Sequence, residues 1–171
     1  MKELHRALGW RFVPVLTDRE PRFTDPGRAH VPTETIKHMA EAGDLAILNK
    51  FMGRLYAVKE SELTTALASH DYSMLDLSIQ FVNKLASQRC AKIVLLPESE
   101  HQLVAQISAA GRKDDTLEII ADYRQNYLAR KETELQIVVN FQHQVKKTAN
   151  QIAKTAFELC QKLSANLSSS L

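Results

Sequence analysis

Few residues in this chain have the types and the spacing that catalysis or metal binding requires. The sequence contains six histidines, and none of them pairs with another His or with a Cys at the spacing of metal ligands. His70 beside Asp71 and His101 beside Glu100 could exchange protons with a substrate, but a histidine next to a carboxylate is common in loops that catalyse nothing. We therefore predict no catalytic site and no metal site.

The glycines give no sign of a loop that binds phosphate. The chain has five glycines, at positions 9, 27, 43, 53 and 111, and each is isolated from the others. A phosphate-binding loop needs glycines at close, fixed spacing, because its backbone N–H groups must approach the phosphate oxygens. The sequence therefore excludes a P-loop and a dinucleotide-binding fingerprint, and we predict a protein that is not an enzyme and binds no cofactor.

Composition and charge are those of an ordinary globular chain. Apolar residues make up 44% of the 171 residues and charged residues 25%, which excludes a disordered or fibrous protein. The 22 Lys and Arg residues nearly balance the 20 Asp and Glu residues, so no overall charge attracts nucleic acid or a membrane surface. No apolar run approaches the roughly 20 residues of a membrane span. Cys90 and Cys160 show no disulfide or metal pattern, and we expect a cytoplasmic protein without membrane insertion.

One segment, from Val31 to Leu67, carries an ordered series of local signals. Residues 33 to 42 have the pattern of a short helix, and Gly43 is the residue type expected just after a helix end. Two β-rich runs follow, on either side of Met52-Gly53, and this arrangement predicts a tight hairpin. Gly53 and the start of the second run, at Arg54, form the sequence Gly-Arg-Leu-Tyr at residues 53 to 56.

The order and spacing of these signals resemble the winged helix-turn-helix of the MerR and phage-excisionase group. In that group a short recognition helix ends in a Gly-x-Leu step, here Gly43-Asp44-Leu45, and a hairpin wing carries Gly-Arg-x-Tyr. A helix that opens with an acidic residue and Leu follows, as at Glu62-Leu63. The resemblance covers residues 31 to 67 and does not include the first helix of the motif, whose place holds Pro21 and Pro26.

The resemblance implies that the helix enters the major groove of duplex DNA and that the hairpin contacts the adjacent backbone. The residues that it assigns to DNA contact are Thr33, Thr35, Lys37 and His38 on the helix and Lys50, Arg54, Tyr56 and Lys59 on the hairpin. The alternative is that these residues form an ordinary helix and hairpin of an α+β domain that binds no DNA.

The middle of the chain predicts a helix, a strand and a second helix. Ser73 can cap a helix with Leu75 and Ile79 on its apolar face. The run from Lys92 to Leu96 has the length and the β-branched content of a buried strand. Pro97 then turns the chain into a helix that ends near Gly111.

Residues 112 to 171 contain neither glycine nor proline, so we predict a long helix from Thr116 to Ser168. A straight helix of this length exceeds the size of a compact domain. It must therefore bend near residues 129 to 134, or project and pair with another helix. Apolar residues three or four apart form a heptad-like seam, which favours a homodimer or a helical protein partner; its members are Leu135, Val138, Val145, Ile152, Leu159 and Leu163. The alternative is a helix that packs on its own domain.

These predictions combine into an α+β, helix-rich fold with three parts. We expect a winged-helix-like domain over residues 1–70, a central helix-strand-helix unit over residues 71–111, and a long C-terminal helix, able to pair as a coiled coil, over residues 112–171. The predicted function is that of a non-enzymatic DNA-binding regulator of transcription, dimeric through its C-terminal helix. The alternative is an adaptor that presents the long amphipathic helix to a protein partner and binds no nucleic acid.

Overall fold

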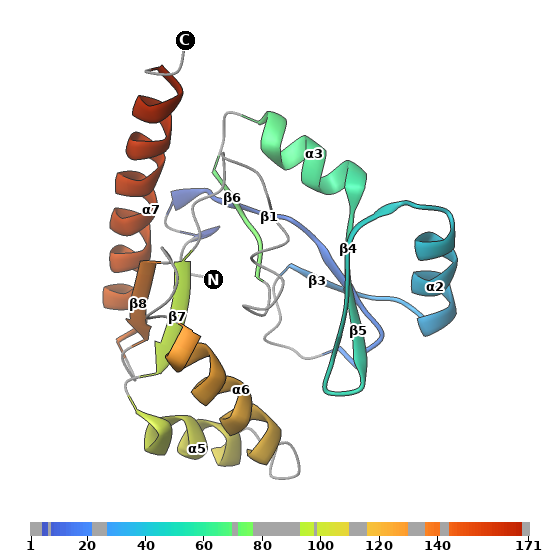
Figure 1. Cartoon of the computed structure of the whole chain (residues 1–171), viewed down its shortest axis with the longest axis horizontal. Helices are drawn as coiled ribbons and strands as arrows, with labels where there is room; N and C mark the ends of the chain where they lie inside the picture. Colours follow the sequence, from blue (N-terminus) through green and yellow to red (C-terminus); the bar gives the residue numbers. More distant parts are fainter. Residues whose placement is uncertain are drawn as a thin grey trace. The chain divides into compact units, whose positions relative to one another are not determined.

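The computed structural model describes residues 5–6, 8–21, 27–69, 72–76, 93–97, 99–109, 116–129, 136–140 and 144–168. The chain forms two compact units, unit 1 (Met1–Leu85) and unit 2 (Ala86–Leu171), and each has its own β-structure among these residues (Figure 1). The domain boundaries predicted after residues 70 and 111 stay predictions.

Among the described residues, unit 1 is built on a four-stranded sheet. Its strands are β2 (Val15–Thr17), β3 (Arg28–His30), β4 (Leu45–Phe51) and β5 (Arg54–Lys59), in the order β3-β2-β5-β4. β2 and β3 are parallel, while β5 is antiparallel to both β2 and β4. Separately, β1 (Arg11–Phe12) pairs in parallel with β6 (Ser73–Met74).

The β4–β5 hairpin forms at the predicted turn. Met52 and Gly53 both have positive φ, at 51° and 73°, and Phe51 pairs with Arg54 across them. Two successive positive φ values are those of a type I′ turn, whose twist matches the twist of the flanking strands. The predicted hairpin is confirmed, although methionine takes a conformation that few residues other than glycine adopt.

Helices α2 (Thr33–Glu41) and α3 (Glu60–Ala68) accompany this sheet. α2 ends where the sequence predicts, because Gly43 adopts a φ of 77°. The Gly43 N–H donates to the Ala40 carbonyl at 3.2 Å, and the Asp44 N–H donates to the Met39 carbonyl at 2.9 Å. This pair of bonds is a Schellman motif, which satisfies carbonyl groups at the helix end.

Apolar side chains pack on both faces of the four-stranded sheet. On the face of Leu16 and Ala57, which we call the α2 face, Ile36 of α2 completes a cluster and is 0% exposed. On the opposite face, which we call the row face, Val15 and Val58 pack with side chains of α3. Both faces exist because successive residues of a strand point to opposite sides.

In its described part, unit 2 combines a parallel strand pair with three helices. The strands are β7 (Ile93–Pro97) and β8 (Gln136–Asn140), and the helices are α5 (Glu100–Ala109), α6 (Thr116–Ala129) and α7 (Val145–Ser168). The predicted strand and helix on either side of Pro97 are thus confirmed, as β7 and α5. α7 packs along both strands (Figure 1). It is 24 residues long, yet no helix among the described residues is both long and apolar enough to span a membrane.

An ion pair joins α5 to α6. The Nη2 atom of Arg124 donates to Glu100 Oε1 at 2.7 Å, and its Nε atom donates to Glu100 Oε2 at 2.8 Å. The hydrogen bond is the main reason that the pKa of Glu100 is lowered and the pKa of Arg124 is raised. This bidentate contact links the exposed surfaces of the two helices.

The predicted long C-terminal helix is wrong. The described residues between 116 and 168 form α6, β8 and α7 in turn, and β8 pairs with β7. The run Ile137-Val138-Val139 is β-branched and favours a strand. It also fits a heptad-like spacing, because a short apolar run is compatible with both periods. α6 ends at Ala129, the start of the stretch where a bend was predicted.

The predicted winged helix is wrong as well. A helix-turn-helix needs a helix directly before the recognition helix, and that place holds β2 and β3. α2 packs on the sheet to which these strands belong. Ser73 is part of strand β6 and does not cap a helix. The helix predicted to follow it falls on residues 77 to 92, which lie outside the described residues.

Candidate ligand site

The register of the strands brings four polar side chains into one line on the row face of the unit 1 sheet. Thr17 pairs with His30 on one side and with Tyr56 on the other, and Tyr56 pairs with Asn49. Laterally paired residues share a face of a sheet. His30, Thr17, Tyr56 and Asn49 therefore follow one another across β3, β2, β5 and β4, and we call them the polar row.

Two members of the polar row are buried. Thr17 is 2% exposed and Asn49 is 6% exposed, whereas Tyr56 is half-buried. The next line of residues on the same face, which includes Val15 and Val58, is apolar. Burying a polar side chain costs free energy that a valine would not cost. The Thr17 hydroxyl offsets part of this cost with a hydrogen bond from the Arg19 N–H, and a polar ligand at the row would offset more of it.

Arg28 places a positive charge beside the polar row. It pairs with Val15, which puts it on the row face, and its guanidinium carbon lies 5.3 Å from the centre of the Tyr56 ring. Its Nη2 atom donates to Asp76 Oδ2 at 2.8 Å. A guanidinium over an aromatic face is held by the negative potential of the ring, so Tyr56 and Asp76 fix Arg28 from two sides.

The turn that follows β2 ties down one end of the polar row. Thr17 Oγ1 accepts a hydrogen bond from the Arg19 N–H at 3.1 Å. The Nδ1 atom of His30 lies 2.8 Å from the Arg19 carbonyl oxygen, and a carbonyl can only accept, so this nitrogen carries the proton. The first bond fixes the turn after β2, and the second joins this turn to the end of β3.

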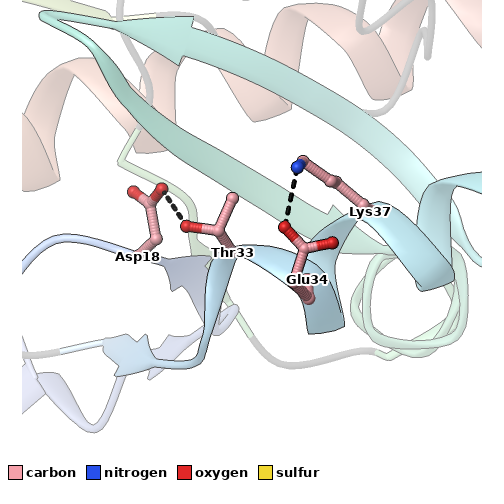
Figure 2. Close-up of polar contacts among 4 residues, drawn as sticks. All are labelled: Asp18, Thr33, Glu34 and Lys37. Carbon is pink, nitrogen blue, oxygen red and sulfur yellow. Dashed lines mark hydrogen bonds and ion pairs between the residues drawn. The ribbon is translucent and has the colours of Figure 1, made fainter.

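Asp18 connects the same turn to α2 and β5. Its Oδ2 atom accepts a hydrogen bond from the Thr33 hydroxyl at 2.9 Å (Figure 2). Its Oδ1 atom accepts a second one from the Leu55 N–H at 2.8 Å. One carboxylate thus fixes the first turn of α2 against the strand that carries Tyr56.

The residues predicted to contact DNA do not form one surface. Four of them lie on α2, which packs on the α2 face: Thr33, Thr35, Lys37 and His38. Strand pairing puts Lys50 and Lys59 on that face also. Arg54 and Tyr56 lie on the row face, because they alternate with Leu55. A recognition helix and its wing must present one continuous basic surface to DNA, whereas the sheet separates Lys37 from Arg54.

Lys37 is also neutralised within α2. Its Nζ atom lies 2.7 Å from Glu34 Oε1 (Figure 2). This hydrogen bond is the largest cause of a lowered pKa at Glu34 and a raised pKa at Lys37. Binding to the phosphates of DNA depends on concentrated positive charge, which this helix does not supply.

The residues predicted to pair helices are divided among different elements. Leu135 lies outside the described residues, Val138 lies in β8, and the other four lie in α7: Val145, Ile152, Leu159 and Leu163. Ile152 is buried, together with Ala149 and Ala156, and α7 packs on β7 and β8. Val145 is exposed. The apolar stripe of α7 is therefore a packing face within unit 2, and the predicted coiled coil is wrong.

Sequence reasoning selected only Tyr56 from this site, and selected it for DNA contact. It missed Thr17, Arg28, Asn49 and Asp76, which come from four separate segments. Asn49 offered a local signal, since it is a polar residue that follows four apolar strand residues. The proximity of these residues depends on strand register, which one sequence does not determine.

Comparisons with known proteins identify the fold. No family model matches the chain, and no curated protein matches its sequence. The solved structure of guanylate kinase from Anaplasma phagocytophilum superimposes on the chain with a TM-score of 0.68 at 16% sequence identity. The match covers 90% of this chain and 76% of that chain.

This likeness overturns the predicted fold class and the predicted function. A winged-helix α+β protein with a coiled-coil helix does not superimpose on a guanylate kinase, so the predicted DNA-binding transcription regulator is wrong. The single long helix on which the adaptor alternative depended is also wrong. No family model supports the resemblance to the MerR and phage-excisionase group. At 16% identity the match bears on fold alone, and the chain has the α/β fold of a guanylate kinase.

Proposed function

We propose that this chain binds guanylate, or a nucleotide of the same class, at the polar row of unit 1, and that it does not transfer phosphate. The observation that carries the proposal is the polar row itself, with Thr17 and Asn49 buried next to an apolar line of the same sheet. The class of ligand comes from the likeness to a guanylate kinase, whose name states the nucleotide on which it acts.

The chemistry of the site suits a nucleotide. The Asn49 side chain offers an amide donor and a carbonyl acceptor, the combination that the edge of a nucleobase requires. The Thr17 hydroxyl adds another group that both donates and accepts. Arg28 lies beside them, over the Tyr56 ring, and a guanidinium is the side chain best matched to a phosphate group.

Phosphate transfer would need groups that this sequence lacks. P-loop enzymes cradle the phosphates of the donor nucleotide with the pattern Gly-x-x-x-x-Gly-Lys-Ser/Thr. The five glycines of the chain are isolated, and none of them belongs to such a pattern. We therefore propose that the chain binds the nucleotide and leaves it unchanged.

Isothermal titration calorimetry with GMP tests the binding. In Asn49→Leu the side chain keeps its size and loses its hydrogen bonds, so the affinity should fall about tenfold, equivalent to about 1.4 kcal/mol. The matched control is Lys50→Gln, because Lys50 is the next residue of β4 and lies on the opposite face. Its affinity should stay within about twofold of the wild type.

Two results would contradict the proposal. The first is the absence of GMP binding to the wild-type protein. The second is GMP binding with wild-type affinity by Asn49→Leu, once circular dichroism has shown that this variant is folded. If Asn49→Leu does not fold, Tyr56→Leu, which removes the support of Arg28, is tested in its place. An assay with ATP and GMP tests the second part of the proposal, that the chain does not transfer phosphate, because formation of GDP would contradict it.

A further inference from the structure

Arg28 is held by two partners of different kinds. Arg28 lies in β3, and the Tyr56 ring lies 5.3 Å from its guanidinium carbon. Both residues belong to the four-stranded sheet. Asp76 comes instead from the segment after β6, a strand of two residues. The Arg28 side chain is 21% exposed and the Asp76 side chain is 58% exposed. The cation is therefore anchored in the sheet, and the anion reaches it from the solvent side.

The contact between them is open to competition. One nitrogen of Arg28 meets one oxygen of Asp76, at 2.8 Å, whereas Arg124 and Glu100 in unit 2 form two such contacts. Ion pairs that face water contribute little to stability, because solvent screens them and both side chains lose freedom. A phosphate group carries more charge than a carboxylate and can accept two hydrogen bonds from one guanidinium.

We propose that Asp76 is an internal competitor, whose carboxylate occupies the place on Arg28 that the phosphate group of the nucleotide takes. This inference rests on the proposed function, because it concerns the phosphate end of the same ligand. On binding, the phosphate displaces Asp76 from Arg28, and Tyr56 keeps the guanidinium in place. Asp76 thereby lowers the affinity for nucleotides and leaves the affinity for the uncharged nucleoside unchanged.

Titration of variants with GMP and with guanosine separates the two ends of the ligand. Asp76→Asn removes the competing charge, so GMP should bind about three- to tenfold more tightly while the affinity for guanosine stays within about twofold. Arg28→Gln should weaken GMP at least about tenfold and have little effect on guanosine. Glu62→Gln is the matched control, because Glu62 is an exposed residue of α3 and the change in net charge is the same.

The outcomes distinguish this inference from the proposed function. If GMP and guanosine bind equally well to the wild type and Asp76→Asn changes neither, the competitor role is wrong and nucleotide binding at the polar row stands. An equal gain in GMP affinity in Glu62→Gln would also overturn it, because the effect would then be one of net charge. If neither ligand binds any folded variant, both proposals fail. Asp76→Ser replaces Asp76→Asn should the latter not fold.

Discussion

The two faces of the unit 1 sheet are built from the same strands and differ in what they bury. On the α2 face, Leu16 and Ala57 close against Ile36, and the cluster is apolar throughout. On the row face, the apolar line with Val15 and Val58 gives way to the polar row. Strand alternation supplies both faces at once, so the polar residues are not a consequence of the fold. The α2 face therefore buries an apolar cluster, whereas the row face combines an apolar cluster with the polar row, where we propose that a ligand binds.

The largest expected effect is on the α2 face. Ile36→Ala removes a side chain that is 0% exposed, and it should lower the free energy of unfolding by about 2–5 kcal/mol, because the cavity cannot fully close. Urea denaturation followed by circular dichroism measures this. The folded fraction of the variant should bind GMP with wild-type affinity. A loss of affinity without a loss of stability would break the division between the faces.

Sequence reasoning succeeded where local signals decide the structure. The Met52-Gly53 turn, the helix stop at Gly43 and the strand at residues 92 to 96 each depend on a few adjacent residues, and the structure has all three. Sequence reasoning failed where pairing between strands that are distant in the sequence decides the structure. β3 follows a stretch that holds Pro21, Pro26 and Gly27 and has no strand pattern, and β8 lies in a stretch without helix breakers. Both are strands because a partner strand completes their hydrogen bonds.

The candidate site was less accessible to sequence reasoning than the fold. Tyr56 attracted notice through a short motif, but its neighbours Thr17 and Asn49 are ordinary strand residues until the register places them beside it. Arg28 and Asp76 are 48 residues apart in the sequence. A shift of one residue in either pairing would turn these side chains to the other face, and no local pattern reports the register.

The next effect concerns the backbone that carries Arg28. Gly27 has a φ of 77°, and a Cβ atom there would lie 2.9 Å from the Phe12 ring and 3.0 Å from the Phe12 Cβ. Gly27→Ala should therefore cost about 1–2 kcal/mol for the left-handed conformation and more for the contact with Phe12. It should also weaken GMP binding, since Gly27 directly precedes β3. Thermal unfolding and calorimetry measure the two effects.

Gly43→Ala is the matched control for Gly27→Ala. Gly43 has the same φ of 77°, and nothing lies within 4 Å of the position of its Cβ atom. This variant should show the conformational cost alone, about 1–2 kcal/mol, with GMP affinity unchanged. Equal destabilisation by the two substitutions would mean that the Phe12 contact relaxes without cost.

A smaller effect is expected at the link between the faces. Thr33→Ala removes the hydrogen bond to Asp18 Oδ2 and leaves Oδ1 bound to the Leu55 N–H. The free energy of unfolding should fall by about 0.5–1.5 kcal/mol, the net value of one hydrogen bond. Thr35→Ala on the same helix should change stability by no more than about 0.5 kcal/mol. An equal loss in both variants would assign the effect to helix propensity instead of the Asp18 contact.

The smallest effect concerns the exposed pair on α2, and its sign follows from the pKa shifts. The pKa of Glu34 is lowered by the hydrogen bond from Lys37, so the contribution of this pair to stability is present above the pKa that Glu34 has in the unfolded chain. It is lost as the pH falls through the lower pKa of the folded state.

In Lys37→Met, carbon-detected NMR titration should show the Glu34 pKa rising toward its ordinary value, with Lys50→Gln as a control that leaves it lowered. Because both side chains face water, the same substitution should leave the unfolding midpoint at neutral pH nearly unchanged. A large loss of stability in Lys37→Met would mean that the α2 surface supports the fold through charge, and the assignment of stability to the apolar contacts of Ile36 would then be incomplete.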